Sequence, residues 1–316
     1  MRINFADAQQ ALGFLTPQLL RINTEIDYQE YPDFDFARFL FVNTDGGMWA
    51  YGSVFYSGDV AGRPEWLDGA GFDMPYADIS TSQFLQENRL AGIGYEWHRQ
   101  ELERAAMMGR NLGSEKARAA RTVADARIYA LTMRGDTSKN MGGLVNSPLV
   151  PQALVASDGA GGGGNSPAFV NKTPDQINRD VNAVLNAPYN STMETKRANT
   201  LLLPTSRLQY MASTRIGDGS DTILKFVREN NSYTLETGQP LNIMGTRELE
   251  TAGAGGTARM MAYANQRDVV QLYLPGPHEF FEPFQKGSFT WEVPGLFNIG
   301  GVEFRRPKGA AYRDGI

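Results

Sequence analysis

The chain's best match to a ligand-binding motif is a glycine-rich run in its C-terminal third. Residues 253–258, with the sequence GAGGTA, match the GxGxxA form of the dinucleotide-binding fingerprint. That fingerprint holds a pyrophosphate only where it joins a strand to the N-terminus of a helix. Here residues 247–250 lack strand character, and residues 260–264 have the composition of a strand. The motif therefore predicts a loop, and the glycines near Gly161 lack the Lys-Ser/Thr pair of a phosphate-binding loop.

The two histidines, His98 and His278, are the natural candidates for metal binding or proton transfer. His278 and Glu282 have the i,i+4 spacing of a helical metal-binding pair. Prolines around this pair disfavour a helix; they are Pro275, Pro277 and Pro283. His98 has carboxylates nearby but no second cluster of strong ligands. We expect both histidines to be packed or surface residues.

Nucleophilic and acid–base catalysis have equally little support. Cysteine is absent, which excludes thiolate nucleophiles, thiolate metal sites and disulfides. Carboxylate pairs such as Asp33 and Asp35 lie two positions apart and predict a solvated face. A Ser-His-Asp triad can be assembled from distant positions, but no nucleophile elbow supports one. We predict no catalytic, cofactor-binding or metal-binding residues, no cofactor and no enzyme activity.

Composition indicates a globular protein without an obvious nucleic-acid or membrane domain. The chain has 316 residues, enough for two lobes, with 41% hydrophobic and 21% charged residues. Its net charge of −5 argues against a dedicated DNA-binding domain, although it leaves room for a local basic face. No apolar run approaches the roughly 18 residues needed to span a bilayer. The N-terminus also lacks the layout of a secretory signal.

The N-terminal third predicts extended chain and strands. Residues 7–15 favour a short helix, and residues 27–41 are aromatic and extended with little of their own to bury against. That second segment is either a frayed terminus or an arm that lies on a neighbour. Alternating side chains predict strands over 48–56 and 93–98. Ser80, with Gln83 three residues on, is a capping box that predicts a helix start.

The rest of the chain mixes helices and strands. The strongest helix signal covers 115–134, with Ser114 as N-cap and Gly135 as C-cap. A second capping box, Thr173 with Gln176, starts a helix expected to reach Asn186. Other predicted elements are helices over 100–108, 205–212 and 221–229, a buried strand over 201–203, strands from residue 259 onward, and a glycine-rich loop or lobe boundary over 157–166. The fold class is therefore α+β.

Three segments in a fixed order resemble one branch of the tailed-bacteriophage major capsid proteins with the Hong Kong 97-like fold. The C-terminal segment, GGVEFRRPK over 300–308 and AYRDGI over 311–316, is similar to the closing strand and tail of that branch. Tyr95 and the residues 100–112 lead into the long helix in the same way, and Leu202-Leu203-Pro204 follows the second capped helix. The resemblance covers about 54–316. It is carried by the ordered set rather than by any single motif.

The resemblance implies an α+β architecture with five parts. Residues 1–48 would be an N-arm and 49–80 an extended β-hairpin loop. Residues 81–141 would form a peripheral domain, with its long spine helix over 115–134. Residues 142–296 would form an axial domain, and 297–316 would return to the peripheral domain as a strand.

The tip of the extended loop is the predicted assembly contact. Trp66 is its largest apolar side chain, flanked by Arg63 and Glu65. We expect Trp66 to be buried against the spine helix of an adjacent subunit, with Arg63 and Glu65 forming ion pairs at the rim. The alternative is that Trp66 folds back on its own subunit.

The implied function is a structural one: self-assembly into the icosahedral head that encloses the phage genome. The implied partners are the chain itself in hexamers and pentamers, portal and decoration proteins, either a separate scaffolding protein or none, and non-specific contact with packaged DNA. Localisation would be the virion, with the host cytoplasm during assembly, and no membrane. Strands begin near residue 48, which leaves no room for a cleaved scaffolding segment. The first lysine is Lys116, so the extended loop cannot supply an isopeptide weld.

Two other functions compete with this interpretation. An encapsulin-like compartment shell shares the fold, and the helix over 7–15 would then bind cargo; the C-terminal resemblance favours the phage protein. A soluble nucleotide-binding enzyme rests only on the glycine run at 253–258.

Overall fold

The structure is a computed structural model that describes residues 34–61, 76–107, 109, 111–161, 164–217 and 219–316. The helix expected over 7–15 lies outside the described residues. The helices are α2 (Arg99–Met107), α3 (Leu112–Arg134), α4 (Pro174–Ser191), α5 (Thr205–Ser213), α6 (Ile223–Glu229) and α7 (Ser232–Thr237). Within the described ranges, no helix is both long and apolar enough to cross a membrane.

Strands form one five-stranded sheet and several smaller ones. The five-stranded sheet has the order β12 (Asn242–Thr246), β11 (Thr200–Pro204), β13 (Arg259–Tyr263), β20 (Ala310–Asp314), β8 (Gln152–Leu154). The three-stranded sheets are β1 (Phe41–Asn43), β14 (Val270–Tyr273), β19 (Gly301–Phe304); β15 (Gly276–Phe280), β18 (Gly295–Ile299), β4 (Arg89–Gly92); and β16 (Phe284–Gly287), β17 (Thr290–Val293), β5 (Tyr95–His98). The two-stranded pairs are β2 (Gly52–Ala61) with β3 (Asp78–Glu87), β6 (Gly135–Asp136) with β7 (Met141–Gly142), and β9 (Gly159–Gly161) with β10 (Gly164–Ser166).

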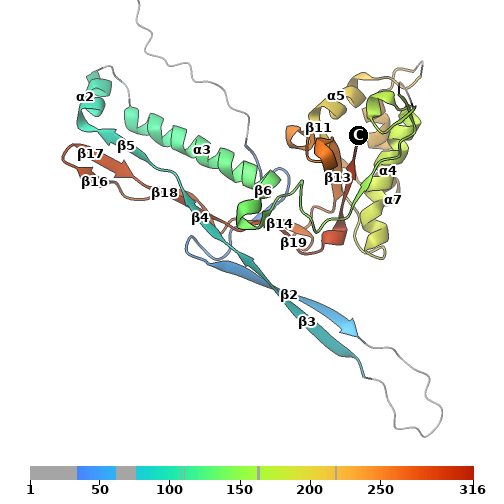
Figure 1. Ribbon diagram of the computed structural model, residues 1–316, viewed down its shortest axis with the longest axis horizontal. Coiled ribbons are helices and arrows are strands. Elements are labelled where there is room, and N and C mark those ends of the chain that lie inside the picture. The colour runs from blue at the N-terminus through green and yellow to red at the C-terminus, as the bar shows by residue number, and fades with distance from the viewer. Residues whose placement is uncertain (1–33, 62–75, 108, 110, 162–163, 218) are drawn as a thin grey trace, which may run out of the picture.

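Helix α3 is the longest described helix and runs along the peripheral strands (Figure 1). Its small and apolar side chains Ala120, Ala124, Ile128 and Leu131 are buried and recur at helical spacing, so one face packs on the sheets. The N-cap is Asn111, whose side chain accepts from the Ser114 amide; the expectation that Ser114 caps the helix was wrong, because the helix begins one turn earlier.

The predicted C-cap of α3 is confirmed. Gly135 has φ 67°, and its amide donates to the Leu131 carbonyl. A Cβ at this position would also lie 2.1 Å from the Met141 carbonyl oxygen, so glycine is required both for the conformation and for the close approach of β7.

The five-stranded sheet separates two hydrophobic cores. Strand β13 is buried along its whole length: Met261 and Tyr263 belong to one core, and Met260 and Ala262 to the other. The second core is closed by α4, α5 and α6, whereas the first continues into α3, β14, β18 and β19. The sheet that carries α4 to α6 and the strands beside α3 (Figure 1) therefore share the first core. The last two strands belong to different sheets: β19 pairs with β14, and β20 pairs with β13.

One ion pair lies inside the five-stranded sheet. Arg259 on β13 donates to both carboxylate oxygens of Asp314 on β20, at 2.6 and 2.9 Å, and Asp314 also accepts from the Ala254 amide at 3.0 Å. The same guanidinium donates to the Val145 carbonyl at 2.7 Å and lies over the Tyr312 ring. Both charged residues are buried, 4% and 1% exposed, so the pair fixes the register of two central strands.

The N-terminal segment packs partly into its own subunit. Strand β1 pairs in parallel with β14, and Phe39 and Leu40 lie in the first core. The Tyr263 hydroxyl donates to the Phe39 carbonyl. For residues 39–43 the expectation of an extended segment without a partner in its own subunit was wrong. The partner strand lies more than two hundred positions away in the chain, so no local pattern reveals the pairing.

The expected helix at Ser80 was also wrong. Residues 78–87 form β3, which pairs antiparallel with β2 in ten consecutive registered pairs. The capping box is a local signal, and here a long run of cross-strand pairs overrides it. Ser80 and Gln83 instead point to opposite sides of a long hairpin that projects from the body (Figure 1).

Candidate assembly surfaces

The exposed hairpin β2–β3 carries an apolar stripe on one face. The register pairs Val54 with Leu85, Tyr56 with Gln83 and Val60 with Ile79, and alternate pairs share a face. The five apolar side chains on this face, Val54, Tyr56, Val60, Ile79 and Leu85, are 43–74% exposed. A soluble monomer rarely presents so many large apolar groups in a row, so this face has the character of an interface.

The opposite face of the hairpin is polar except at its root. Ser53, Ser57, Ser80 and Ser82 lie on it, together with the pair Phe55 and Phe84. The two phenylalanine rings stack with centroids 5.2 Å apart, and the guanidinium of Arg305 lies over Phe55 at 5.6 Å. The root of this face therefore rests on the body, which leaves the apolar stripe on the outer side.

The predicted contact residues Arg63, Glu65 and Trp66 belong to the loop joining β2 to β3, which lies outside the described residues. Their role stays a prediction. The sequence reasoning missed the stripe on the shaft below them, although the alternation of Ile79, Thr81 and Gln83 with serines was a signal for it.

Helix α3 presents a second exposed surface. Arginines and small apolar residues alternate along it; the exposed members are Arg118, Ala119, Arg121, Val123, Arg127, Ala130 and Arg134. Arg127 pairs with Asp136 at 3.0 Å and Arg134 with Glu248 at 2.6 Å. Over its 23 residues the helix has five basic and two acidic residues. This face is therefore cationic and partly apolar.

The hairpin segment has the opposite charge. Residues 49–87 contain six carboxylates and one arginine, in a chain whose net charge is only −5. Among the described residues, Glu87 is the carboxylate at a stripe-face position, and it already pairs with Arg89 at 2.6 Å, so the stripe itself is apolar rather than acidic.

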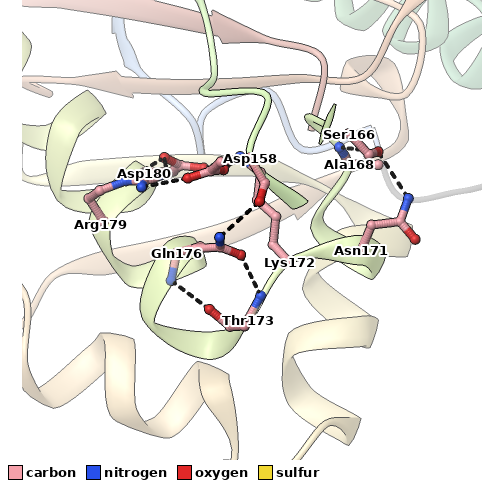
Figure 2. Close-up of polar contacts among 9 residues, drawn as sticks. All are labelled: Asp158, Ser166, Ala168, Asn171, Lys172, Thr173, Gln176, Arg179 and Asp180. Atoms are coloured by element: carbon pink, nitrogen blue, oxygen red, sulfur yellow. Dashed lines mark hydrogen bonds and ion pairs between the residues drawn. The ribbon is translucent and has the colours of Figure 1, made fainter. Parts of the chain in front are cut away.

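A third polar cluster anchors the glycine-rich hairpin β9–β10. Figure 2 shows Asp158, Lys172, Arg179 and Asp180 converging beside the start of α4. Arg179 contacts Asp158 at 2.6 Å and Asp180 at 2.8 Å, while Lys172 contacts Asp180 and lies 3.5 Å from Asp158. The hydrogen bond from Arg179 is the main reason that the pKa of Asp158 is lowered, with the charges of Arg179 and Lys172 assisting against a smaller effect of burial.

The structure confirms the capping box beside this cluster. Thr173 and Gln176 exchange side-chain-to-backbone hydrogen bonds, and the Gln176 side chain also donates to the Asp158 carbonyl at 3.0 Å (Figure 2). The glycine-rich segment, expected to be a loop, is therefore a short hairpin tied to α4 at its foot.

The chemical motifs of the sequence do not form a reactive site. The run 253–258 contains one irregular 3-10 turn, Ala254–Gly256, and leads into the strand β13 rather than into an α-helix. His278 lies in β15, with Nε2 3.2 Å from the Ile93 carbonyl oxygen, and the Nδ1 of His98 lies 2.8 Å from the Thr290 hydroxyl. Among the described residues, no group of three or more histidines and carboxylates could hold a metal ion.

Comparison with known proteins identifies the fold. The capsid of the Myoviridae phage XM1 superposes with a TM-score of 0.77 at 18% identity, covering 96% of this chain and 98% of the other. The capsid of an empty GTA particle gives 0.62 at 10% identity, covering 94% and 95%. Mycobacterium phage Bobi gives 0.56 at 12% identity, covering 96% and 99%. The chain therefore has the α+β Hong Kong 97-like fold, as predicted. A search of curated protein sequences found no match.

The sequence itself matches a family model over most of its length. The model describes the major capsid protein, and residues 62–316 match it. This match confirms the structural capsid role and does not favour the encapsulin-like alternative. The capsid neighbours support self-association into a shell and a place in the virion. The chain belongs to the major capsid protein family.

Proposed function

We propose that this subunit builds the phage head by laying its hairpin along helix α3 of a neighbouring copy. The observation that carries the proposal is the apolar stripe of β2–β3, which is exposed over its whole length in the single subunit. An isolated two-stranded ribbon is marginal in water, so such a shaft gains stability from a surface that covers it.

Helix α3 fits the stripe in length. Ten residues of strand span about 33 Å, and a 23-residue helix spans about 35 Å. The exposed Ala119, Val123 and Ala130 offer apolar contact between the arginines. DNA would match the arginines but not the apolar groups, so the mixed character favours a protein partner on this face.

The remaining parts follow the division expected from the sequence. Residues 1–48 act as N-arm and 49–80 as extended loop. Residues 81–141 and 297–316 form the peripheral domain and 142–296 the axial domain, whose copies meet around the axes of hexamers and pentamers. The shell encloses the genome, contacts its DNA without sequence preference, and catalyses no reaction. Scaffolding, portal and decoration proteins are its further partners, and the host cytoplasm is where it assembles.

The test removes the stripe without touching the body. Tyr56→Ser with Ile79→Ser should leave thermal unfolding of the free subunit nearly unchanged, because both side chains are exposed. Each lost anchor costs about 2 kcal/mol or more per contact in a shell. Sedimentation and negative-stain microscopy should then show free subunits instead of shells.

The matched control is Leu235→Ser on α7, an equally exposed apolar residue away from the hairpin. Shells that form normally with the double variant, or that fail with both variants, would contradict the proposed contact.

A further inference from the structure

Buried side-chain amides hold the root of the hairpin in addition to the strand ladder. We propose that Asn298, supported by Asn88, is a positioning residue that fixes the direction in which the hairpin leaves the body. The inference rests on the proposed function in one respect only: a fixed direction matters because the stripe must reach a neighbour. The clamp itself is a property of the free subunit.

The entry to β2 shows the clamp most directly. Residues 48–51 are irregular, yet Asn298 on β18 directs its amide nitrogen at two of their carbonyls, Met48 at 2.9 Å and Ala50 at 2.8 Å. Asn88, between β3 and β4, donates to the same Ala50 carbonyl at 3.0 Å. The segment that enters the hairpin is thus tied both to β18 and to the returning side of the hairpin.

The returning strand is tied to the same place. The backbone N–H of Asn88 donates to the Tyr51 carbonyl at 2.9 Å, and the Gln86 side chain donates to the Gly300 carbonyl at 2.5 Å. A Cβ on Gly300 would lie 2.6 Å from the Asn88 side-chain oxygen, so a glycine is needed to admit this amide. Asn298, Asn88, Gln86 and Gly300 therefore converge on the root.

Packing alone does not explain why asparagines occupy these two buried positions. Asn298 is 3% exposed and Asn88 is 6% exposed. Their side-chain oxygens are buried and have no hydrogen-bond partner among the described residues. A buried unpaired acceptor is unfavourable by about 1–3 kcal/mol. Apolar side chains at these positions would avoid that penalty. The hydrogen bonds that the two asparagines donate to the entry segment therefore account for the presence of asparagine.

The side chain of Arg305 supports the hairpin on its polar face. Arg305 lies over the Phe55 ring and its Nε is 3.5 Å from a carboxylate oxygen of Glu303. Glu303 is buried and accepts from the Gln271 side chain at 2.7 Å. The guanidinium is therefore held from below while it contacts the hairpin from the side opposite the apolar stripe.

The geometry makes a root clamp effective. Two-stranded ribbons twist and bend readily, and a shaft of about 33 Å that swings by about 10° moves its end by about 6 Å. Such a shift exceeds the tolerance of a packed interface, where side chains interdigitate. Direction at the root thus decides whether the stripe meets its partner surface.

The test measures direction in the free subunit. Because the chain has no cysteine, Val60→Cys and Lys139→Cys introduce the sole thiols, one on the hairpin shaft and one on the body, for spin labels. Double electron–electron resonance should give a narrow distance distribution for the parent. Asn298→Ala and Asn298→Asp, which both remove the donors, should each broaden the distribution or shift its mean.

Two controls separate direction from folding. Asn165→Asp changes an exposed asparagine in the same way and should leave the distribution narrow. If Asn298 variants fail to give the parent's circular dichroism, Gln86→Ala at the half-buried root tests the clamp instead. A distribution as narrow as the parent's in every folded clamp variant would overturn the inference.

Shell formation, measured in clamp variants that keep Val60 and carry no label, provides a separate readout. A broadened distance distribution together with aberrant or missing shells supports both the clamp and its role in directing the stripe to a neighbour. A narrow distribution together with lost shells would refute the clamp while leaving the hairpin contact intact, so failure of one proposal is distinguishable from failure of the other.

Discussion

Replacing Asp314 with alanine removes the carboxylate from the buried ion pair of the central sheet. Three hydrogen bonds are lost, two from Arg259 and one from the Ala254 amide. Arg259 stays buried at 4% exposure and keeps the Val145 carbonyl and the Gln152 side chain as acceptors, but no counter-charge. Breaking one side of a buried pair costs about 3–5 kcal/mol, which is a large part of the stability of a typical domain.

The assay is urea unfolding of the free subunit followed by tryptophan fluorescence. Asp221→Ala is the comparison, because Asp221 pairs with Lys225 at a similar distance of 2.7 Å while both side chains are more than half exposed. That variant should cost less than about 1 kcal/mol. The double variant Arg259→Met with Asp314→Leu should recover most of the loss, because apolar packing often replaces a buried pair without penalty.

The pH dependence adds a signature. Burial opposes ionisation of Asp314, but the hydrogen bonds from Arg259 and Ala254 and the attraction of Arg259 outweigh it, so its pKa is lowered below the ordinary 3.8. The stabilisation is therefore complete above the unfolded pKa and is lost as pH falls through the lower folded pKa. The difference between wild type and Asp314→Ala should be constant above about pH 5 and shrink below about pH 4. An Asp314→Ala loss under about 1 kcal/mol at neutral pH would refute the reasoning.

Three further predictions concern other parts of the subunit. Shells should dissociate fully in denaturing gels without reductant, because the chain has no cysteine and its first lysine is Lys116; a surviving ladder of multimers would contradict this. Asp180→Ala, which leaves the buried Lys172 facing only Asp158, should lower the unfolding free energy by about 3–5 kcal/mol in the same urea assay; a loss under about 1 kcal/mol would count against it. Trp66→Ala should abolish or slow assembly while thermal unfolding of the monomer is unchanged; an unfolded monomer would place Trp66 in a core instead.

Local signals gave the correct elements where several of them agreed. The long helix, its glycine C-cap and the capping box at Thr173 were all predictable, because amphipathic period and cap chemistry coincide at these positions. The buried strand β11 was predictable from three consecutive leucines. The fold class and family followed from the order of such elements.

Non-local pairing explains the errors. Nothing within residues 39–43 reveals that β1 lies beside β14, and nothing near Ser80 reveals ten cross-strand pairs with β2. The root clamp was invisible for the same reason, since Asn298 and Ala50 meet only when β18 is in place. The sequence therefore predicted the extended loop as a contact, but which face of the hairpin is apolar depended on the register.

The order of strands in the central sheet has a consequence for the timing of synthesis. Strand β8 pairs through Gln152 with Tyr312 on β20, and β13 also waits for β20 to complete its second edge. A nascent chain therefore holds β8 and one edge of β13 unpaired until residues 310–314 have left the ribosome. Contacts so distant in sequence form slowly, and a subunit without them lacks a finished core. Newly made chains thus pass through an interval in which neither lobe is complete, which sets a delay between translation and entry into the growing shell.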